Sequence, residues 1–402
     1  MKFILLLLSL VSCSFSNPLQ NAIDNASPYS TLKLPTGIYN GNIVINKPIT
    51  IIGKGNDVVI QGQNKGSVVK ILSSHVKLQN LTITNSGNRM DTIDSGISMS
   101  KVKQCEINSC KILNSLYGID MEMVSDSLFT NNYITSKELE ISLRGNALKL
   151  YYSNNNFFSN NTIEKSRDVT LNYSSNNIFD KNNFLNNRFA THLSLSNNNT
   201  FKNNLYMYNS VSIMLMGAKN TKILNNTIKS SKGAAGVGVM IGGVSNLVFE
   251  KNTLKFNAKA IYISGQEKAK GMKRYINYNE ISYNGEAIHF HATIKDNTIT
   301  HNKFLGNIDD VVKDISGNFG TLNKVEYNYW NRYAGFDRNG DNIGDTSYKI
   351  YQYADQLWHY NNKVKFFYGS PIMTLMNFLA NIAPFIEPNL LLEDTHPVFI
   401  NK

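Results

Sequence analysis

This chain of 402 residues contains few charges: Asp, Glu, Lys and Arg make up 17% of it, against about 25% in ordinary soluble domains. With 26 Gly and 8 Pro it is neither collagen-like nor a Pro- and Gly-rich disordered chain. The net charge of +11 comes without a dense run of Lys or Arg, so we expect no nucleic-acid partner. The chain has 58 Asn residues, interleaved with regularly spaced Ile, Leu and Phe, and this pattern indicates a folded, repetitive protein.

An export signal is expected at the N-terminus. Residues 1–16 combine an early Lys, an apolar run and small residues before a cleavage position near Asn17. The alternative is a lipoprotein signal, because residues 10–13 have the lipobox spacing and processing there would leave Cys13 lipidated. Either signal leads to an exported protein, soluble in one case and tethered by lipid in the other.

The sequence repeats over most of its length. A six-residue frame, apolar-x-x-Asn-x-apolar, recurs every 21 to 29 residues, and a short apolar stretch of period two precedes each frame. Short strands separated by Asn, Ser and Gly turns at such a period are typical of a β-solenoid. We predict an all-β fold in which residues 42–330 form a parallel β-helix of about 12 coils. A lead-in or cap at residues 17–41 precedes it, and a C-terminal cap and docking tail at residues 331–402 follows.

The Asn of each frame is predicted to face the interior. There it stacks on the Asn of the next coil and hydrogen-bonds both the tight turn and the neighbouring amide. The positions of this ladder are Cys110, Asn132, Asn161, Asn182, Asn204, Asn226, Asn252, Asn279, Asn302 and Asn328. Cys110 replaces Asn in the column, which favours a buried structural role; a metal pair or a disulfide with Cys105 is the alternative. Flanking amides such as Asn131 and Asn160 are expected to adopt the left-handed turn conformation that Asn tolerates.

The same register determines which side chains face outward on the strand that precedes each frame. Imidazole and thioether groups lie there on consecutive coils, about 4.8 Å apart per strand, and these soft donors suit Cu(I) far better than calcium or magnesium. A His-x-His pair on a later strand is predicted to be an entry site or second site for copper. The alternative is that the Met side chains pack beneath a loop or against a partner. The candidate copper ligands are His192, Met214, Met216, Met240, His289 and His291.

A polysaccharide lyase or hydrolase is the main alternative from another functional class. Such an enzyme needs clustered carboxylates, often with Arg or Lys as base. Asp120 and Glu122 share one strand, but the next coil offers Lys149 and Tyr151, and the central coils carry no acid in the outward column. A carbohydrate-binding module is a third alternative, disfavoured by the few aromatic residues in that column. We therefore expect no catalytic residues.

A loop after the last frame places oxygen-bearing side chains at alternate positions around a Gly. Asp337, Asn339, Asp341 and Asp345 resemble the ligands of a calcium loop, although the terminal Glu of an EF-hand is absent. The alternative is a capping turn held by hydrogen bonds between Asp side chains and the backbone.

The tail contains a mostly apolar stretch. A helix is expected between Pro371 and Ala383, because Pro stands at its start and Pro384 follows directly after it. This helix either caps the open end of the solenoid or presents an apolar face to another protein.

These features resemble the NosD family, within the wider carbohydrate-binding and sugar-hydrolase-like β-helix group. The resemblance spans nearly the whole mature chain and depends on the first coil at residues 47–55, the Asn-x-Ile frames, residues 329–345 and the tail at residues 370–397. It implies a right-handed parallel β-helix in the periplasm that docks on an ABC transporter made of a permease and an ATPase. It also implies a part in maturing the copper–sulfur centre of nitrous oxide reductase. Copper, a copper chaperone and the reductase are then the expected ligand and partners.

Overall fold

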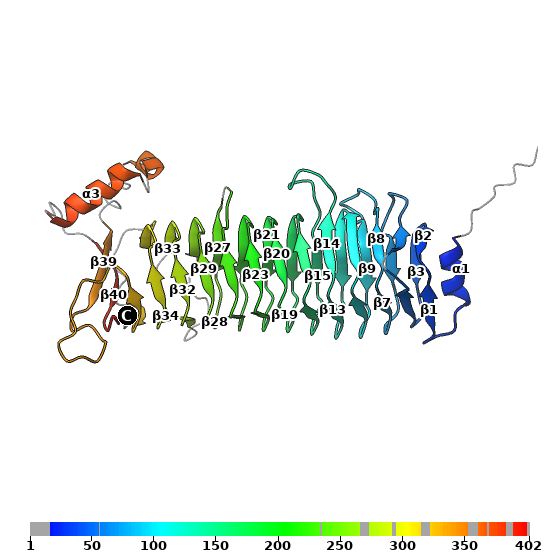
Figure 1. Cartoon of the computed structure of the whole chain (residues 1–402), viewed down its shortest axis with the longest axis horizontal. Coiled ribbons are helices and arrows are strands. Elements are labelled where there is room, and N and C mark those ends of the chain that lie inside the picture. Colours follow the sequence, from blue (N-terminus) through cyan, green and yellow to red (C-terminus); the bar gives the residue numbers. More distant parts are fainter. Residues whose placement is uncertain are drawn as a thin grey trace, which may run out of the picture.

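The computed structural model is a long rod, with the N-terminal helix at one end and a small C-terminal unit at the other (Figure 1). The predicted signal segment, residues 1–16 with Cys13, lies outside the described residues. Within the described ranges, no helix has the length and apolar character needed to cross a membrane. The structure describes residues 17–55, 57–233, 235–265, 273–291, 295–314, 322–352, 361–367, 370–382 and 389–399.

Three parallel sheets form the rod, and each coil contributes one strand to each sheet, so every strand pairs with the strand three further along the chain. The sheets contain 13, 13 and 12 strands, which confirms the predicted parallel β-solenoid. Sheet A consists of β1 (Thr31–Leu34), β4 (Thr50–Gly53), β7 (Lys77–Gln79), β10 (Glu106–Asn108), β13 (Leu128–Thr130), β16 (Phe157–Ser159), β19 (Ile178–Asp180), β22 (Thr200–Lys202), β25 (Lys222–Leu224), β28 (Leu247–Glu250), β31 (Arg274–Asn277), β34 (Asn297–Thr300) and β37 (Lys324–Glu326). Sheet B consists of β2 (Gly37–Asn40), β5 (Val58–Gln61), β8 (Thr82–Thr84), β11 (Lys111–Ser115), β14 (Tyr133–Ser136), β17 (Thr162–Glu164), β20 (Asn183–Leu185), β23 (Leu205–Met207), β26 (Thr227–Lys229), β29 (Thr253–Lys255), β32 (Glu280–Ser282), β35 (Lys303–Leu305) and β38 (Tyr329–Trp330). Sheet C consists of β3 (Ile43–Ile45), β6 (Val69–Ile71), β9 (Ser95–Ser100), β12 (Tyr117–Glu122), β15 (Leu148–Tyr151), β18 (Asp168–Asn172), β21 (Phe189–Ser194), β24 (Val211–Met216), β27 (Val237–Gly242), β30 (Lys259–Ile263), β33 (Glu286–Phe290) and β36 (Asp309–Lys313).

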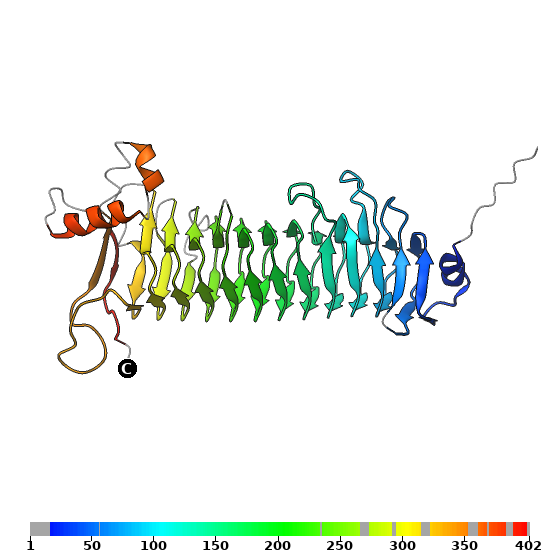
Figure 2. The ribbon, with the colours of Figure 1, turned by 45° about the horizontal axis from the view of Figure 1, so that its top comes forward.

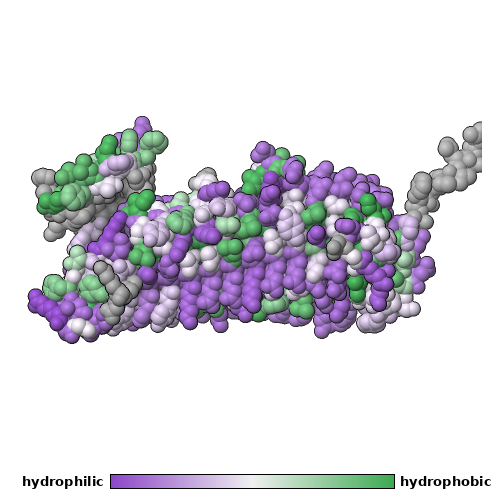
Figure 3. All heavy atoms as spheres, viewed as in Figure 1, coloured by the Kyte–Doolittle hydropathy of each residue, from purple (hydrophilic) through white to green (hydrophobic). Residues whose placement is uncertain are grey.

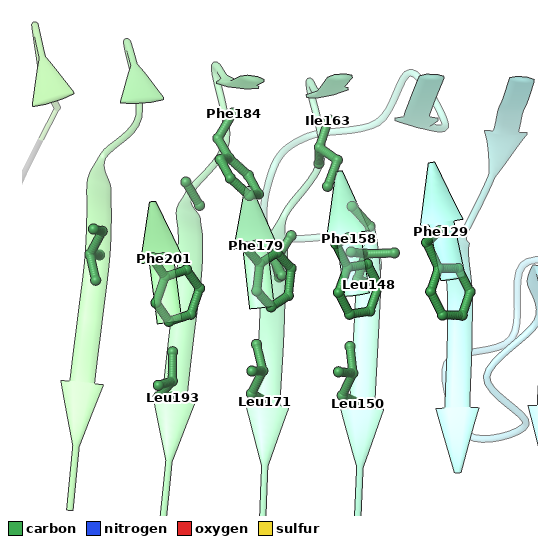
Figure 4. Packing of buried hydrophobic residues seen from close by; sticks show 14 of the residues in the cluster. Phe129, Leu148, Leu150, Phe158, Ile163, Leu171, Phe179, Phe184, Leu193 and Phe201 are labelled. Carbon is green, nitrogen blue, oxygen red and sulfur yellow. The ribbon is translucent and has the colours of Figure 1, made fainter. Parts of the chain in front are cut away.

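Identical side chains stack along the interior of the rod. Figure 4 shows Phe129, Phe158, Phe179 and Phe201 on successive strands of sheet A. Their ring centroids lie 4.7, 4.4 and 5.0 Å apart, and the ring planes are within 14° of parallel. Because neighbouring strands are about 4.8 Å apart, in-register rings meet at stacking distance, and the core itself favours the parallel register.

A column of hydrogen-bonded Asn side chains fills the corner between sheets A and B. Asn204 donates from Nδ2 to Asn226 Oδ1 and to the carbonyl oxygen of Phe179, both at 3.0 Å, and its Oδ1 accepts the backbone N–H of Asn182 at 2.8 Å. Cys110 lies at the head of the column, where its backbone N–H donates to Asn132 Oδ1 at 2.9 Å. The Nδ2-to-Oδ1 bonds connect Asn132, Asn161, Asn182, Asn204, Asn226, Asn252, Asn279, Asn302 and Asn328.

The expectation of one inward amide per coil is too low, because the other two corners carry amide columns of their own. The turn amides flanking the first column do adopt the predicted conformation: Asn131 and Asn160 have φ of 56° and 54°. The additional columns contain Asn156, Asn177 and Asn199 between sheets C and A, and Asn187, Asn209, Asn257, Asn284 and Asn307 between sheets B and C.

Helix α1 (Pro18–Asn25) covers the N-terminal end of the rod. Asn17 caps it, because its Oδ1 accepts the backbone N–H groups of Leu19 and Gln20 at 3.1 and 3.2 Å. Leu19 and Ile23 are buried against the first coil. Strands β1 and β2 already pair with β4 and β5, so the first coil lies within the range predicted as a lead-in.

An antiparallel pair of strands, β39 (Tyr348–Gln352) and β40 (Asn389–Asp394), closes the other end. Leu391 and Leu392 of β40 are buried in the main core. Beyond β40 the tail runs along the last coil, since the N–H of Thr395 donates to the carbonyl of Val325 at 3.2 Å and the N–H of Val398 to that of Asn328 at 3.0 Å. These contacts make the strand pair the cap of the solenoid.

The predicted tail helix is present as α3 (Pro371–Ile382), preceded by the 3-10 helix η2 (Asn362–Phe367). Both lie to the side of the β39–β40 pair, as the two views of the rod show (Figures 1 and 2). Among the described side chains of α3, Met373 is buried, and it packs against Val312 and Val364. Most of the helix surface is therefore left exposed.

Candidate metal centre

The outward column of sheet C brings three of the predicted copper ligands together. His192 is in register with Met214, and Met214 with Met240, on the neighbouring strands β21, β24 and β27. All three side chains are half-buried, whereas the flanking Ile213 and Leu215 of β24 are fully buried in the core. Strand alternation thus places one imidazole and two thioethers on the same outer face. They lie on neighbouring strands, which are about 4.8 Å apart.

The surroundings of His192 favour its neutral form. Burial lowers its pKa below the ordinary value, with the Asp168 carboxylate opposing this effect and the Arg188 guanidinium adding to it. Asp168 is itself engaged by Arg188 in a two-point ion pair, in which Arg188 Nε lies 2.9 Å from Asp168 Oδ1. The Phe189 ring meets the imidazole edge-on at 5.7 Å. A neutral imidazole retains the lone pair that a metal ion needs.

Met216 lies at the edge of this group, in the adjacent outward column with Ser194 and Gly242. Its side chain is 37% exposed and leans across to the next strand, since a Cβ added at Gly242 would lie 2.7 Å from the Met216 sulfur. Gly242 therefore provides the space in which this thioether rests. The face as a whole offers soft, neutral donors from three consecutive coils, the donor chemistry that Cu(I) prefers.

The structure places His289 and His291 in a separate cluster. Tyr262 stands between Met240 and His289 in the outward column, so about 10 Å, two strand spacings, separate the pair from the nearest thioether. His289 is buried, and its Nδ1 is hydrogen-bonded to Glu286. Burial by itself would lower the pKa of His289, but the contacts with Asp314 and Glu286 raise it above the ordinary value.

Two carboxylates of this cluster, Glu286 and Asp314, are absent from the ligands predicted from sequence. The residue that follows His291 in its column is Asp314, because β33 and β36 are in register. Extending the outward column by one more coil would have identified it. Glu286, three residues before His289, carries no such signal.

Asp120, the acid considered for a polysaccharide-acting enzyme, has a cationic neighbour. Asp120 lies 3.0 Å from Lys149 Nζ and is mostly buried. Burial raises the pKa of Asp120, and Lys149 opposes the shift. Thr170, His192 and Met214 follow on the next coils of the column. In this column the pair is thus followed by three side chains without a carboxylate.

The oxygen-rich loop after the last coil uses its side chains to hold its own backbone. Asp337 accepts the N–H groups of Gly340 and Asn342 at 2.7 and 2.8 Å, and Asp345 accepts the N–H of Arg338 at 2.9 Å. Asn339 and Asp341 bond each other and nearby backbone N–H groups. This is the geometry of the capping-turn alternative, and calcium binding by the loop stays a prediction.

The two described cysteines are buried free thiols. Cys110 Sγ lies 3.4 Å from the carbonyl oxygen of Asn108, and burial raises the pKa of this thiol to about 12. Burial also raises the pKa of Cys105. Burial thus favours the neutral thiol at both positions, which fits the structural role expected of Cys110.

The chain is a parallel β-solenoid that carries thioether and imidazole groups on the outer face of one sheet. A family model described as "Periplasmic copper-binding protein (NosD)" matches residues 130–335. Two relatives are each described as "Probable ABC transporter binding protein NosD". The protein from Stutzerimonas stutzeri is 30% identical over 91% of this chain and 86% of its own length. The protein from Pseudomonas aeruginosa is 31% identical over 91% and 87%. The chain belongs to the NosD family of periplasmic copper-binding proteins.

Solved structures with the same fold include an N-terminal fragment of the bacteriophage Phi29 gene product 12, with a TM-score of 0.55 at 12% identity, covering 76% of this chain and 67% of the fragment. The catalytic domain of a GH87 alpha-1,3-glucanase in complex with tetrasaccharides has a TM-score of 0.52 at 13% identity, covering 75% and 65%. At such identities the similarity establishes the β-helix alone, and the family itself is one of binding proteins rather than known enzymes.

Proposed function

We propose that this protein binds Cu(I) on the outer face of sheet C and presents it for assembly of the copper–sulfur centre of nitrous oxide reductase. It would act beside an ABC transporter and exchange copper with a copper chaperone. The main support for the proposal is that His192, Met214 and Met240 lie in register on neighbouring strands. The chain also belongs to the copper-binding NosD family. Thioether sulfur and neutral imidazole are soft to borderline ligands and suit a monovalent copper cargo.

The exposure of the column suits a cargo that must be released. Each of the three side chains is half-buried, and Met216 beside them is more open. Met side chains are unbranched and rotate freely, so they can close around an ion and then pass it to competing ligands without moving the backbone. The water-accessible part of each thioether also has a cost that a polar side chain at the same position would avoid.

Replacing Met214 and Met240 with Leu in one variant is expected to weaken Cu(I) binding by about tenfold or more, since it removes two of the three donors but keeps their volume. The measurement is an anaerobic competition titration against a chromogenic Cu(I) chelator. The matched control is Met207→Leu, because Met207 is half-buried on the outside of sheet B, away from the column. An affinity equal to that of the unmodified protein in the double variant would contradict the proposed site.

The transporter contact is proposed for α3. Both relatives are named as probable ABC transporter binding proteins. The helix forms an apolar strip beside the cap that is visible on the surface (Figure 3). Burying such a patch against an apolar surface of a partner removes apolar area from water and so favours binding. The exposed side chains of the strip are Ile372, Leu375, Met376, Phe378, Leu379 and Ile382.

A variant carrying Leu375→Asp and Phe378→Asp is expected to lose co-purification with the transporter from membrane extracts while unfolding at an unchanged temperature. Leu375 and Phe378 are 56% and 58% exposed, so the charges cost little in the free protein but are buried in a complex. The control is Ile38→Asp, a 63% exposed position at the far end of the rod. Retained co-purification would exclude α3 as the contact. Deleting the whole tail is less informative, because it also removes β40 from the cap.

A further inference from the structure

A polar cluster at the C-terminal end of sheet C is independent of the thioether column. It spans three consecutive coils, and its members lie on β30, on β33 and just after β33 and β36. The Tyr262 ring packs against both imidazoles of the cluster, with centroid distances of 4.8 and 5.8 Å. The members are Lys259, Tyr262, Glu286, His289, His291 and Asp314.

Both imidazoles converge on one carboxylate oxygen. His291 Nδ1 lies 2.7 Å from Asp314 Oδ2, and His289 Nε2 lies 3.1 Å from the same atom. His289 Nε2 is buried, yet among the described residues no group is aligned with it as a hydrogen-bond partner. This shared contact gathers two imidazoles and a carboxylate, groups that bind divalent first-row metals, around one point.

The opposite side of His289 has the arrangement that commonly supports a metal-bound imidazole. Its Nδ1 is hydrogen-bonded to Glu286, which leaves Nε2 directed toward Asp314. Glu286 is in turn held by Lys259, whose Nζ lies 2.8 Å from both carboxylate oxygens. A carboxylate on the remote nitrogen fixes the tautomer and the ring orientation and makes the ligating nitrogen more basic. Lys259 offsets the charge of that carboxylate.

We propose that His289 Nε2, His291 Nδ1 and Asp314 form a second metal site, for a divalent ion with Cu²⁺ as the preferred one. Two imidazoles and a carboxylate are borderline to hard ligands that bind divalent first-row metals, and Cu²⁺ binds such sets most tightly. The site differs from the thioether column in oxidation state as well as in position. His289 and Asp314 are buried or nearly so, while the His291 side chain is 54% exposed and gives an ion access from solvent.

Metal binding requires a small rearrangement of the site. In the described part of the chain, no three His, Cys, Asp or Glu side chains already have the spacing of a metal site. Asp314 Oδ2 occupies the position between the two imidazoles, so the carboxylate has to turn aside as an ion takes over its contacts. Asp314 directly follows β36 (Asp309–Lys313) and its side chain is 19% exposed, so the carboxylate can turn without displacing the core.

The test is titration of the full mature chain with a Cu²⁺ salt, followed by electron paramagnetic resonance. We expect one ion with coupling to two nitrogens. His291→Gln and Asp314→Asn should each weaken binding at least tenfold and change the spectrum, and the Met214→Leu, Met240→Leu double variant should bind Cu²⁺ as the unmodified protein does. The matched control is His301→Gln, since His301 is an exposed imidazole stacked between Tyr278 and Tyr327.

Unchanged affinity and an unchanged two-nitrogen spectrum in both His291→Gln and Asp314→Asn would overturn the second site. So would an equal loss in His301→Gln, because binding would then be spread over surface imidazoles. Unfolding temperatures measured without metal show whether each variant is folded, and the half-exposed His291 is the position where substitution disturbs folding least. The Cu(I) titration of the thioether column is a separate measurement, so failure of either site is distinguishable from failure of the other.

Discussion

Replacing Asn204 with Leu is expected to unfold the solenoid or to lower its free energy of unfolding by about 4–8 kcal/mol, since each stranded buried polar group costs about 1–3 kcal/mol. The substitution removes the acceptor of two Asn182 donors, the backbone N–H at 2.8 Å and Nδ2 at 3.1 Å. It also removes the donor to the Phe179 carbonyl and to Asn226 Oδ1. Asn204 is 2% exposed, so water cannot replace these bonds.

The matched control is the adjacent amide. Asn203 is exposed, has φ of 57° and donates to Asp180 Oδ1 at 2.8 Å, so Asn203→Gly keeps the left-handed turn and should change the free energy of unfolding by no more than about 1 kcal/mol. Chemical denaturation of both variants measures the difference. Similar midpoints for the two variants would mean that the Asn column contributes little to stability.

The repeat made most of the fold predictable. Its six-residue frame sets a strand on each side of the Asn, and the parallel register follows once identical residues stack, as Phe158 does on Phe129. The amide columns at the other two corners can also be recognised in the sequence, as Asn residues at a regular spacing from the first column. Asn177 precedes Asn182 by five residues and Asn187 follows it by five, which is one amide at each corner of the coil. That spacing follows from strands of three to five residues joined by tight turns.

The candidate sites were predictable only in part. Strand alternation places His192, Met214 and Met240 on one face, because inward and outward positions are fixed by the buried residues between them. The same alternation assigns His289 to the outer face but does not reveal that Glu286 and Asp314 bury it there. Whether an outward side chain is buried depends on side chains from other coils. The alternation of apolar and polar residues within one strand does not predict it.

The cap shows the same limit at longer range. The helix at 371–382 follows from local sequence, because Pro and apolar spacing act within a few residues. The pairing of β39 with β40 joins segments that are 37 residues or more apart, and the alternation of neither strand specifies its partner. Once the two strands are paired, Asp394 at the end of β40 lies next to Asn328, the last Asn of the column, and accepts its hydrogen bonds.

Asp394 ends the Asn column with a carboxylate. Its Oδ2 accepts the backbone N–H of Asn328 at 3.1 Å, Asn328 Nδ2 at 2.9 Å and Trp330 Nε1 at 2.9 Å. Along the column from Asn132 to Asn302, the Oδ1 of the next Asn takes the first two of these bonds. Asp394→Leu is expected to lower the free energy of unfolding by about 3 kcal/mol or more, since three buried donors lose their acceptor. Equilibrium denaturation checks this, and an unchanged midpoint would mean that the cap does not depend on Asp394.

Asp394→Asn separates the hydrogen bonds from the charge. The amide oxygen of the new Asn can accept the same three donors. The amide nitrogen cannot accept the bond that the His396 N–H donates to Asp394 Oδ1, and this is the one bond lost. We therefore expect the free energy of unfolding to change by no more than about 1 kcal/mol at pH 7.

Burial raises the pKa of Asp394, and the bonds from Trp330 and Asn328 oppose the shift. A carboxyl whose pKa is higher in the folded state stabilises most when protonated. The free energy of unfolding therefore falls as the pH rises from about 4, the ordinary pKa of Asp, to the raised value.

The Asn variant lacks this group, so the stability of the natural protein relative to Asp394→Asn should be greatest near pH 4 and should decline toward pH 7. Other acids with raised pKa values, such as Asp120 and Asp310, titrate in both proteins and cancel in the difference. A difference that stays constant over this range would show that Asp394 keeps its ordinary pKa. If instead the decline is found, the carboxylate carries an electrostatic cost at neutral pH. The cap would then retain Asp over Asn because a second acceptor oxygen holds His396 and with it the tail that runs along the last coil.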